Sequence, residues 1–336
     1  MNKEELKQLF ESFNSQKIIV IGDVMIDSYL WGSVSRISPE APVPIMAVKK
    51  RESRLGGAAN VALNLQAMGA TPILCGVVGD DDKASLFEEL MQLQKLNKEG
   101  IIKVKDRLTT VKFRIIGNNM HMLRVDEESE NLLSSKDSQN LFDKIKILTD
   151  KHHPSAIIFE DYDKGVISKE LIEKVVELAK KNNIPTCVDP KINNFKSYNN
   201  VTLFKPNLKE LKEGMKLHND LKDEKQISDA SVKLQKELNI DILLTTLSEK
   251  GIFYSQKQNK DYISEIIPAH KRDISDVSGA GDTVISVAAL FLAAKQTAEI
   301  IAKISNLAGG LVCEHVGVVP INKEKLFNEA VKDFLQ

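Results

Sequence analysis

The chain has 336 residues, of which 42% are hydrophobic and 28% charged, so it can bury a sizeable core and is not a disordered chain. Its 46 basic and 47 acidic residues give a net charge of −1, which argues against nucleic acid or an anionic membrane as a partner. No stretch approaches the roughly 18 consecutive apolar residues of a membrane-spanning helix, and the charged N-terminus does not resemble a signal peptide. Because Cys75, Cys187 and Cys313 lie far apart in apolar stretches, we expect buried free thiols and a cytoplasmic location.

Six short apolar runs predict strands at residues 17–22, 73–79, 156–160, 185–189, 201–206 and 241–247. Their apolar character is nearly continuous, which is typical of parallel strands that are covered on both faces. Helical patterns lie between most of them, for example at 60–68 and at 168–183, where Ser168 is a candidate N-cap. The alternation predicts an α/β fold with a central, mostly parallel sheet flanked by helices.

Two segments do not fit this alternation. Residues 28–55 contain three prolines and the only tryptophan, and residues 104–127 are typical of two strands around a GNN turn. We therefore predict a single domain spanning 1–336, with a small β-sheet inserted as a lid over a ligand. The exposed edges and apolar face of such a lid favour a homodimer formed through it.

The stretch DVSGAGDT at 276–283 places very small residues before a carboxylate and an apolar helical pattern. Gly279, Ala280 and Gly281 would leave backbone N–H groups free at the positive end of the helix dipole, which favours an anion. Asp282 would then lie beside that anion, where it suits proton abstraction from an attacking hydroxyl during phosphoryl transfer. An ordinary helix start with an acidic first turn fits the spacing equally well.

Two further motifs lie near expected strand ends. Asp27 follows the first strand, where ligands bind in open α/β sheets, although an ordinary loop acid explains it as well. The glycine-rich entry to a helix contains Gly56 and Gly57, which could let a sugar approach the backbone, with Asn60 as a side-chain donor; a tight turn alone explains the glycines equally well.

The segment KPNLKE at 205–210 also follows an expected strand. Asn207 and Glu210 are three residues apart and can face one side of a starting helix, where they could hold Mg²⁺ through water. The alternative is a capping box, in which the two residues only satisfy the helix end.

Together these motifs resemble the ribokinase-like (PfkB) family of sugar kinases. The resemblance rests on GGAAN (56–60), PNLKE (206–210) and DVSGAGDT (276–283), which occur in the family's order. Within that family, SRISPEAPVP with EDYDKGVIS (160–168) and VDPK (188–191) looks like the D-glycero-β-D-manno-heptose-7-phosphate kinases, in their stand-alone form.

The resemblance implies roles for matching positions. It implies ATP and Mg²⁺ as cofactors, Asp282 as the catalytic base, and an anion hole at Gly279, Ala280 and Gly281. It places the sugar hydroxyls at Asp27, Gly56, Gly57 and Asn60. It also implies a K⁺ site near Asp276. The positions implied to bind ATP and Mg²⁺ are Asn207, Leu208, Lys209, Glu210, Thr246, Ser248, Gly251 and Asn306.

One cluster favours a phosphorylated sugar. Lys112, Arg114 and Arg124 lie on the expected lid, and strand alternation puts Lys112 and Arg114 on one face. With Lys164 or Arg36 they could pair with the phosphate of the substrate. Ordinary charge on a solvated strand is the alternative.

The resemblance therefore implies phosphorylation of heptose 7-phosphate at O1, which would give the 1,7-bisphosphate for ADP-heptose and lipopolysaccharide core synthesis. One alternative is a PfkB kinase for another sugar or sugar phosphate, of the fructose, ribose or tagatose phosphate type. A second alternative is a non-catalytic sugar sensor, against which the presence of Asp282, Asn207 and Glu210 argues.

Overall fold

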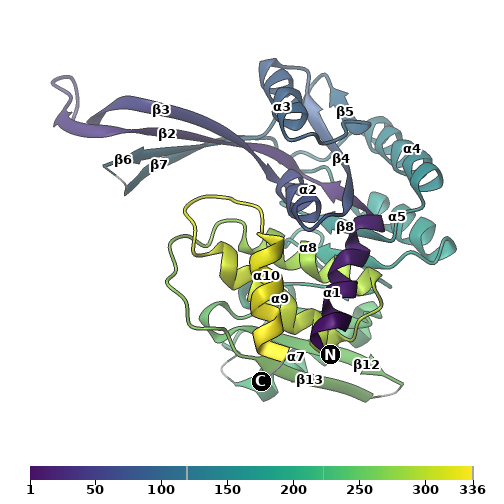
Figure 1. The fold of residues 1–336 in the computed structure, drawn as a ribbon. Coiled ribbons are helices and arrows are strands. Elements are labelled where there is room, and N and C mark those ends of the chain that lie inside the picture. The colour runs from purple at the N-terminus through teal and green to yellow at the C-terminus, as the bar shows by residue number, and fades with distance from the viewer. Residues whose placement is uncertain (119, 222, 260, 335–336) are drawn as a thin grey trace.

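The computed structural model describes residues 1–118, 120–221, 223–259 and 261–334, and within them the strands form a nine-stranded and a four-stranded sheet. Figure 1 shows the smaller sheet projecting from the body of the molecule. In this described part of the chain, no helix combines the length and the apolar character needed to cross a bilayer. The α/β fold predicted from the sequence is confirmed.

The larger sheet is mostly parallel. Its strands are β1 (Lys17–Gly22), β4 (Thr71–Gly79), β5 (Gly100–Val104), β8 (Ala156–Glu160), β9 (Thr186–Asp189), β10 (Leu203–Phe204), β11 (Ile242–Thr246), β12 (Ile252–Gln258) and β13 (Asp261–Ile267). They lie in the order β13-β12-β11-β10-β9-β8-β1-β4-β5, in which the pairs β11–β12 and β12–β13 are antiparallel and the other pairs of these described strands are parallel. The carboxyl ends of β1, β8, β9 and β10 consequently lie along one edge, where open α/β sheets bind ligands.

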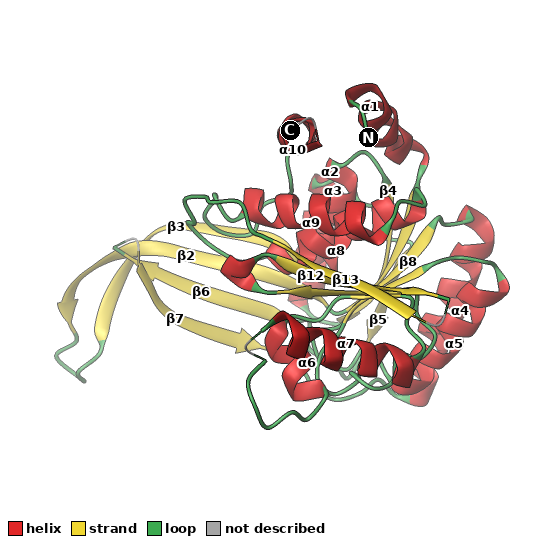
Figure 2. Cartoon of the chain, turned by 90° about the horizontal axis from the view of Figure 1, so that it is seen from below, coloured by secondary structure: helices red, strands yellow, loops and turns green. Residues whose placement is uncertain are grey.

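Helices cover both faces of this sheet (Figure 2). They are α1 (Lys3–Ser12), α2 (Ala58–Ala67), α3 (Asp82–Leu93), α4 (Ser135–His152), α5 (Lys169–Lys181), α6 (Leu208–Gly214), α7 (Glu224–Leu238), α8 (Ala280–Ala293), α9 (Ala298–Val312) and α10 (Lys323–Phe334). Two short 3₁₀ turns lie at Phe13–Ser15 and Ser248–Lys250. Each face of the sheet has its own hydrophobic core, one packed against α1, α2, α8 and α9 and the other against α4, α5 and α7. Successive apolar side chains of β1 point alternately into these two cores, which explains the continuous apolar runs.

The projecting sheet is built from β2 (Val24–Ile37), β3 (Pro44–Gly57), β6 (Val111–Gly117) and β7 (Met120–Glu127). We call these four strands the lid sheet; their order is β3-β2-β6-β7. β2 and β3 form a long hairpin, and β2 runs parallel to β6. The lid sheet combines both predicted lid segments, although residues 104–110 are not part of it because Val104 ends β5. Asn119 of the predicted GNN turn lies outside the described residues.

The predicted helices and strands differ from the structure mainly at their ends. The helix predicted to begin at residue 60 begins at Ala58, and Ser168 caps α5 as expected, accepting a hydrogen bond from Leu171 N at 3.2 Å. The strand predicted at 201–206 is only Leu203–Phe204. Pro206 has no N–H for a sheet bond, and Asn207 already caps α6, so the strand cannot continue. The three cysteines are buried free thiols, as predicted.

Candidate active site

The N-terminus of α8 lies beside the carboxyl ends of β8 and β9, against which the helix packs. Its N-cap is Gly279, at φ +79°, a left-handed conformation that favours glycine. Within the described residues, the N–H groups of Gly281 and Asp282 make no hydrogen bond, so they are available to an anion. The prediction of three free amides is wrong for Ala280, whose N–H donates to Val277 O at 3.3 Å in the turn that starts the helix.

Asp282 is buried and is held by two donors. Asn60 Nδ2 donates to Asp282 Oδ2 at 2.7 Å, and the Tyr162 hydroxyl donates to Oδ1 at 2.8 Å. Burial raises the pKa of the Asp282 carboxyl above its ordinary value, while the hydrogen bonds from Asn60 and Tyr162 oppose the rise. The structure thus brings together Asp282 and Asn60, two residues that the sequence assigned to one site, and adds Tyr162.

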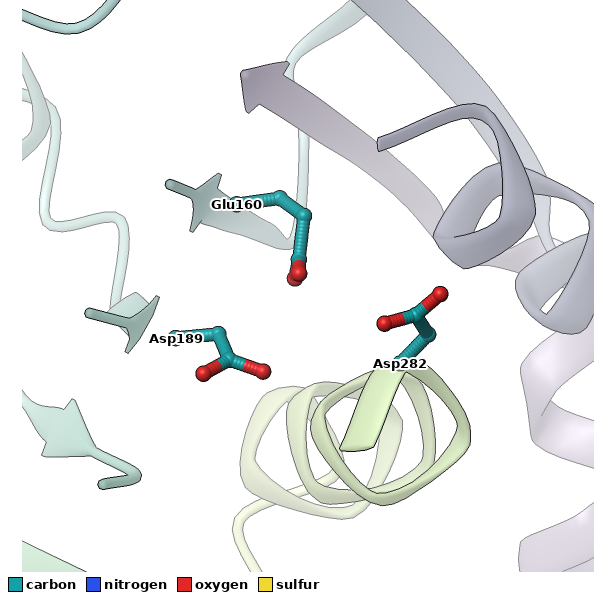
Figure 3. Close-up of side chains that lie close together, drawn as sticks. All are labelled: Glu160, Asp189 and Asp282. Carbon is teal, nitrogen blue, oxygen red and sulfur yellow. The ribbon is translucent and has the colours of Figure 1, made fainter. Parts of the chain in front are cut away.

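Two more carboxylates lie next to Asp282. Glu160 ends β8 and Asp189 ends β9, and their oxygens lie within 4.8 Å of one another and of an Asp282 oxygen (Figure 3). Burial and the charges of Asp189 and Asp282 raise the pKa of Glu160 well above its ordinary value, which favours its neutral form.

A buried lysine supplies positive charge to these carboxylates. Lys205 Nζ lies 2.8 Å from Asp189 Oδ2, and a Cβ atom added at Gly281 would lie 3.6 Å from both atoms. The carboxylate spacing could suit a metal ion, but Lys205 Nζ already pairs with Asp189, so we assign no ion here. The same ammonium lies next to the free amides of α8, and together they can attract a phosphoryl group.

Asn207 and Glu210 form a capping box at the start of α6. Asn207 Oδ1 accepts a bond from Glu210 N, and Glu210 Oε2 accepts one from Asn207 N, each at 2.8 Å. Glu210 Oε1 also accepts a hydrogen bond from Lys191 Nζ at 2.5 Å. Because these oxygens are engaged, the pair fits a contact to Mg²⁺ through water better than direct ligation.

The expected nucleotide positions converge from three elements. Asn207 pairs with Thr246 through an isolated bridge, and Thr246 N donates to Pro206 O at 3.1 Å. Gly251, at φ +99°, packs its backbone against the carbonyl of Ile267.

The side chain of Asn306 on α9 is tied to the same segment. Its Nδ2 donates to Pro268 O at 2.9 Å, so it fixes the connection that leads from β13 toward α8. Ser248 begins the short 3₁₀ turn next to Gly251, at φ +54°.

The side chains of two residues of the PNLKE motif point away from the expected nucleotide site. Leu208 packs against the apolar core beneath α6. The Lys209 side chain is 79% exposed and lies 3.8 Å from Glu213 along the same helix. Neither side chain is oriented like Glu210, so only the backbone at these two positions remains a candidate for nucleotide contact.

Asp27 lies buried at the start of the lid sheet. It forms an ion pair with Arg114 on β6, and its carboxylate lies so close to Gly56 that a Cβ atom there would clash with Oδ2. Gly57, at φ +57°, makes the turn into α2. These residues therefore form one wall that runs from β2 to Asn60.

Lys112 and Lys164 meet at a shared carboxylate. Lys112 Nζ lies 3.1 Å from Glu128 and 3.2 Å from Asp126, and Lys164 Nζ lies 2.7 Å from Glu128 and 2.8 Å from Glu130. The lid sheet is thus joined to the loop after β8. Lys112 and Arg114 share a face, as predicted, but both are already paired with acids.

Arg36 does not join this group as expected. Arg36 is exposed on the outer part of β2, nine residues beyond Asp27, or about 30 Å along an extended strand. It therefore cannot share a phosphate with Lys164 of the same chain. Arg124 does join the group: it lies opposite Arg114 on β7, and its side chain, 59% exposed, pairs at 3.0 Å with Asp126, the acid that Lys112 also contacts.

Asp276 holds the loop before α8 in place through hydrogen bonds to its carboxylate. Its carboxylate accepts hydrogen bonds from Ser278 N and Gly317 N, each at 2.9 Å. This fixes the loop that delivers Gly279, and it places a charged oxygen where the sequence suggested a monovalent cation.

Four residues of this site were not predicted from the sequence: Glu160, Asp189, Lys205 and Tyr162. A signal was present, since Glu160 and Asp189 are the last residues of predicted strands and Lys205 directly follows β10. Strand ends at one edge of a parallel sheet converge, so their polar residues were candidates for one site.

Comparisons with known proteins agree with this geometry. Residues 15–325 match the model of the pfkB family carbohydrate kinases. The chain is 36% identical over 315 residues to bifunctional protein HldE of Sulfurimonas denitrificans, and 38% identical over 313 residues to HldE of Methylobacillus flagellatus. These matches cover 94% and 93% of this chain but only 64% and 62% of those relatives, so the chain spans less than two thirds of their length.

Solved structures share the fold at low sequence identity. Phosphofructokinase-2 from Escherichia coli in complex with potassium superposes with a TM-score of 0.76 at 15% identity, covering 96% of this chain and 100% of that one. Arabidopsis thaliana ribokinase complexed with ribose and ATP gives a TM-score of 0.69 at 18% identity, covering 93% and 98%. The ribokinase-like fold is therefore established, and the chain belongs to the pfkB family of carbohydrate kinases and is a sugar kinase.

Proposed function

We propose that the chain transfers the γ-phosphoryl group of ATP to O1 of D-glycero-β-D-manno-heptose 7-phosphate, giving the 1,7-bisphosphate for ADP-heptose and lipopolysaccharide core synthesis. The observation that carries this proposal is the buried carboxylate of Asp282 directly behind free amides at the start of α8. Similarity to HldE proteins over most of the chain, together with SRISPEAPVP in the lid sheet, supports the choice of sugar.

Asp282 would act as the general base. The O1 hydroxyl of the sugar gives its proton to the Asp282 carboxylate as O1 attacks the γ-phosphorus. The new O1–P bond forms while the bond from that phosphorus to the bridging oxygen breaks, and ADP leaves with the bond electrons. Gly281 N, Asp282 N and Lys205 Nζ lie where they could stabilise the transferring group.

The nucleotide would extend from α8 toward α6 and the loop after β11. Asn207 and Glu210 would hold Mg²⁺ through water, and the ion would neutralise charge on the phosphates. The backbone of 246–251 and the connection fixed by Asn306 would line the rest of the nucleotide site. Asp276 and the backbone around it are the candidate K⁺ site.

Lys112, Lys164 and Arg114 would recognise the phosphate that the substrate already carries. In the structure each is paired with an acid, and Glu128 bridges the two lysines. A phosphate dianion can replace a carboxylate between two ammonium groups, because it carries more charge and more acceptor oxygens. Binding of the sugar phosphate would therefore release Glu128 and let the lid sheet adjust over the sugar.

A homodimer through the lid sheet and a cytoplasmic location belong to the same proposal. Leu123 and Val125 of β7 are 57% and 43% exposed, on the face opposite Lys112 and Arg114, where a second copy could cover them. Sedimentation of a monomer at assay concentrations would contradict the dimer. The three unpaired buried cysteines support a reducing compartment.

A kinase for another sugar phosphate is the alternative, since the base and the amides of α8 would serve any acceptor hydroxyl. The decisive variant for the chemistry is Asp282→Asn, which keeps the size of the side chain but removes its basicity. We expect turnover to fall by about a hundredfold or more while sugar binding, measured by calorimetry, is retained. A variant that releases ADP at the wild-type rate would refute the assignment.

A further inference from the structure

We propose that Tyr162 is a positioning residue for Asp282, whose hydroxyl holds the carboxylate in one orientation and in the charged form that accepts the proton of the sugar. The inference rests on the proposed role of Asp282 as base. It adds a residue that the sequence motifs do not single out.

The orientation of Asp282 is set by one donor on each oxygen. The Tyr162 hydroxyl donates to Oδ1 at 2.8 Å and Asn60 Nδ2 donates to Oδ2 at 2.7 Å. The carboxylate cannot rotate about its χ2 bond without breaking one of these bonds. Each oxygen keeps a further lone pair, so the group can still accept a proton from a bound hydroxyl.

Tyr162 is itself fixed on three sides. Its backbone N–H donates to Asp23 Oδ2 at 2.8 Å, and its hydroxyl bonds Asp282. Lys191 Nζ lies 5.4 Å from the centre of its ring, and that ammonium also bonds Glu210 at 2.5 Å. Tyr162 therefore connects the α6 side of the site with the candidate base, through contacts that leave its ring little freedom.

The surroundings of Asp282 explain why a donor is needed. Asp189 from β9 disfavours a further negative charge on it, whereas Lys205 after β10 and Asn60 from α2 favour one. Glu160 from β8 also faces it, but burial and the nearby acids favour the neutral form of Glu160 by raising its pKa. A hydrogen bond to the charged form favours ionisation. Burial and the nearby acids also raise the pKa of the Tyr162 hydroxyl well above its ordinary value, so it stays protonated and remains a donor.

Tyr198 provides a matched control for a role limited to packing. It is another buried tyrosine, and its hydroxyl donates to Asp161 Oδ2 at 2.7 Å. It makes no hydrogen bond to Asp282. Tyr162→Phe and Tyr198→Phe therefore remove the same atom from the same kind of tyrosine–aspartate pair, and only one pair includes the candidate base.

The test is the pH profile of kcat for heptose 7-phosphate in wild type, Tyr162→Phe and Tyr198→Phe. Loss of a donor raises the pKa of Asp282, so we expect the acid limb of Tyr162→Phe to move to higher pH. We also expect a loss of about tenfold in kcat near pH 6.5, with KM for the sugar within about twofold of wild type. The acid limb of Tyr198→Phe should coincide with that of wild type. The substrate phosphate titrates in the same way in all three assays, so it cannot cause a difference between the enzymes.

An acid limb of Tyr162→Phe that coincides with that of wild type would overturn the inference. Replacing Tyr162 by a fluorinated tyrosine guards against a folding defect, because it keeps the ring and hydroxyl and makes the hydroxyl a stronger donor. Its acid limb should move to lower pH, and an unmoved limb would again contradict the role. Different results would contradict the proposed function itself: Asp282→Asn with the wild-type rate, or a wild-type protein that does not phosphorylate heptose 7-phosphate.

Discussion

The region around Asp282 and the lid sheet differ in how they hold their charges. Asp282, Glu160, Asp189 and Lys205 are all less than 6% exposed, and they lie at fixed ends of a helix and of core strands. By contrast, Lys112 and Arg114 lie on the projecting strands of the lid sheet and Lys164 lies on the loop after β8, and these three side chains are 12–15% exposed. Burial makes the first arrangement costly to disturb, whereas the pairs of the second can exchange partners.

This difference separates chemistry from specificity. On the proposed mechanism, the buried region would need nothing from the sugar beyond a hydroxyl, so it would serve any acceptor that the fold can bind. The choice among sugars would depend on the lid sheet and the loop after β8, where Glu128 bridges Lys112 and Lys164. Substitutions in the two regions should accordingly affect different kinetic constants.

Arg114→Ala is expected to have the largest kinetic effect of the substitutions that test whether the lid sheet recognises the phosphate of the sugar. This change removes a cation near the expected phosphate and leaves the buried Asp27 without its partner. We expect kcat/KM for heptose 7-phosphate to fall by about a hundredfold or more, and the loss for free heptose to be clearly smaller. Steady-state kinetics with both sugars measures the two losses.

The matched control is Arg51→Ala. Arg51 lies on β3 of the same sheet, opposite Leu30, and alternation places it on the face away from Arg114. It should change neither constant by more than about twofold. Equal losses for the two sugars in Arg114→Ala would mean that Arg114 supports the sheet and not the phosphate.

A smaller, pH-dependent effect is expected at Asp23, which joins the two regions. Its carboxylate accepts bonds from the N–H groups of Tyr162, Lys164 and Val166, and burial next to Asp161 raises its pKa to about 6. A raised pKa favours the folded state below the unfolded value of 3.8, and this contribution disappears as the pH rises through about 6. Asp23→Asn should therefore cost less unfolding free energy at pH 7.5 than at pH 4, by roughly 1–3 kcal/mol.

Asp81→Asn is a control for which the dependence of stability on pH should have the opposite sign. Asp81 caps α3, and although burial opposes it, hydrogen bonds from Thr109 and Ala84 lower its pKa. The cost of this substitution should grow with pH. Chemical unfolding at the two pH values measures both differences, and a cost of Asp23→Asn that also grows with pH would contradict the account.

Much of the buried region could be predicted from the sequence. The apolar runs gave the core strands because their residues are covered on both faces, and the small residues at 279–281 gave the start of α8. Asp282 and Asn60 were placed in one site, 222 positions apart in the chain, and they are hydrogen-bonded. The local pattern gave the two helix starts but left an ordinary helix start equally open, and the resemblance to the sugar kinases placed the two residues in one site.

The contacts of the lid sheet and of the loop after β8 could not be predicted in the same way. Alternation along β6 placed Lys112 and Arg114 on one face, but the length of the hairpin that carries Arg36 away depends on pairing across bulges. Tyr162 reaches Asp282 because Asp23, 139 positions away, holds its backbone. Such a contact depends on the whole fold and leaves no periodic signal in the sequence.

The most direct test of the central claim is an ADP-release assay with the purified chain and a panel of sugars with and without a phosphate group. The panel should include heptose 7-phosphate, free heptose, fructose, ribose and tagatose phosphate. We expect the highest kcat/KM with heptose 7-phosphate, and a new phosphate at O1 of the product by phosphorus NMR. Preference for another acceptor, or ADP release that no sugar accelerates, would contradict the account.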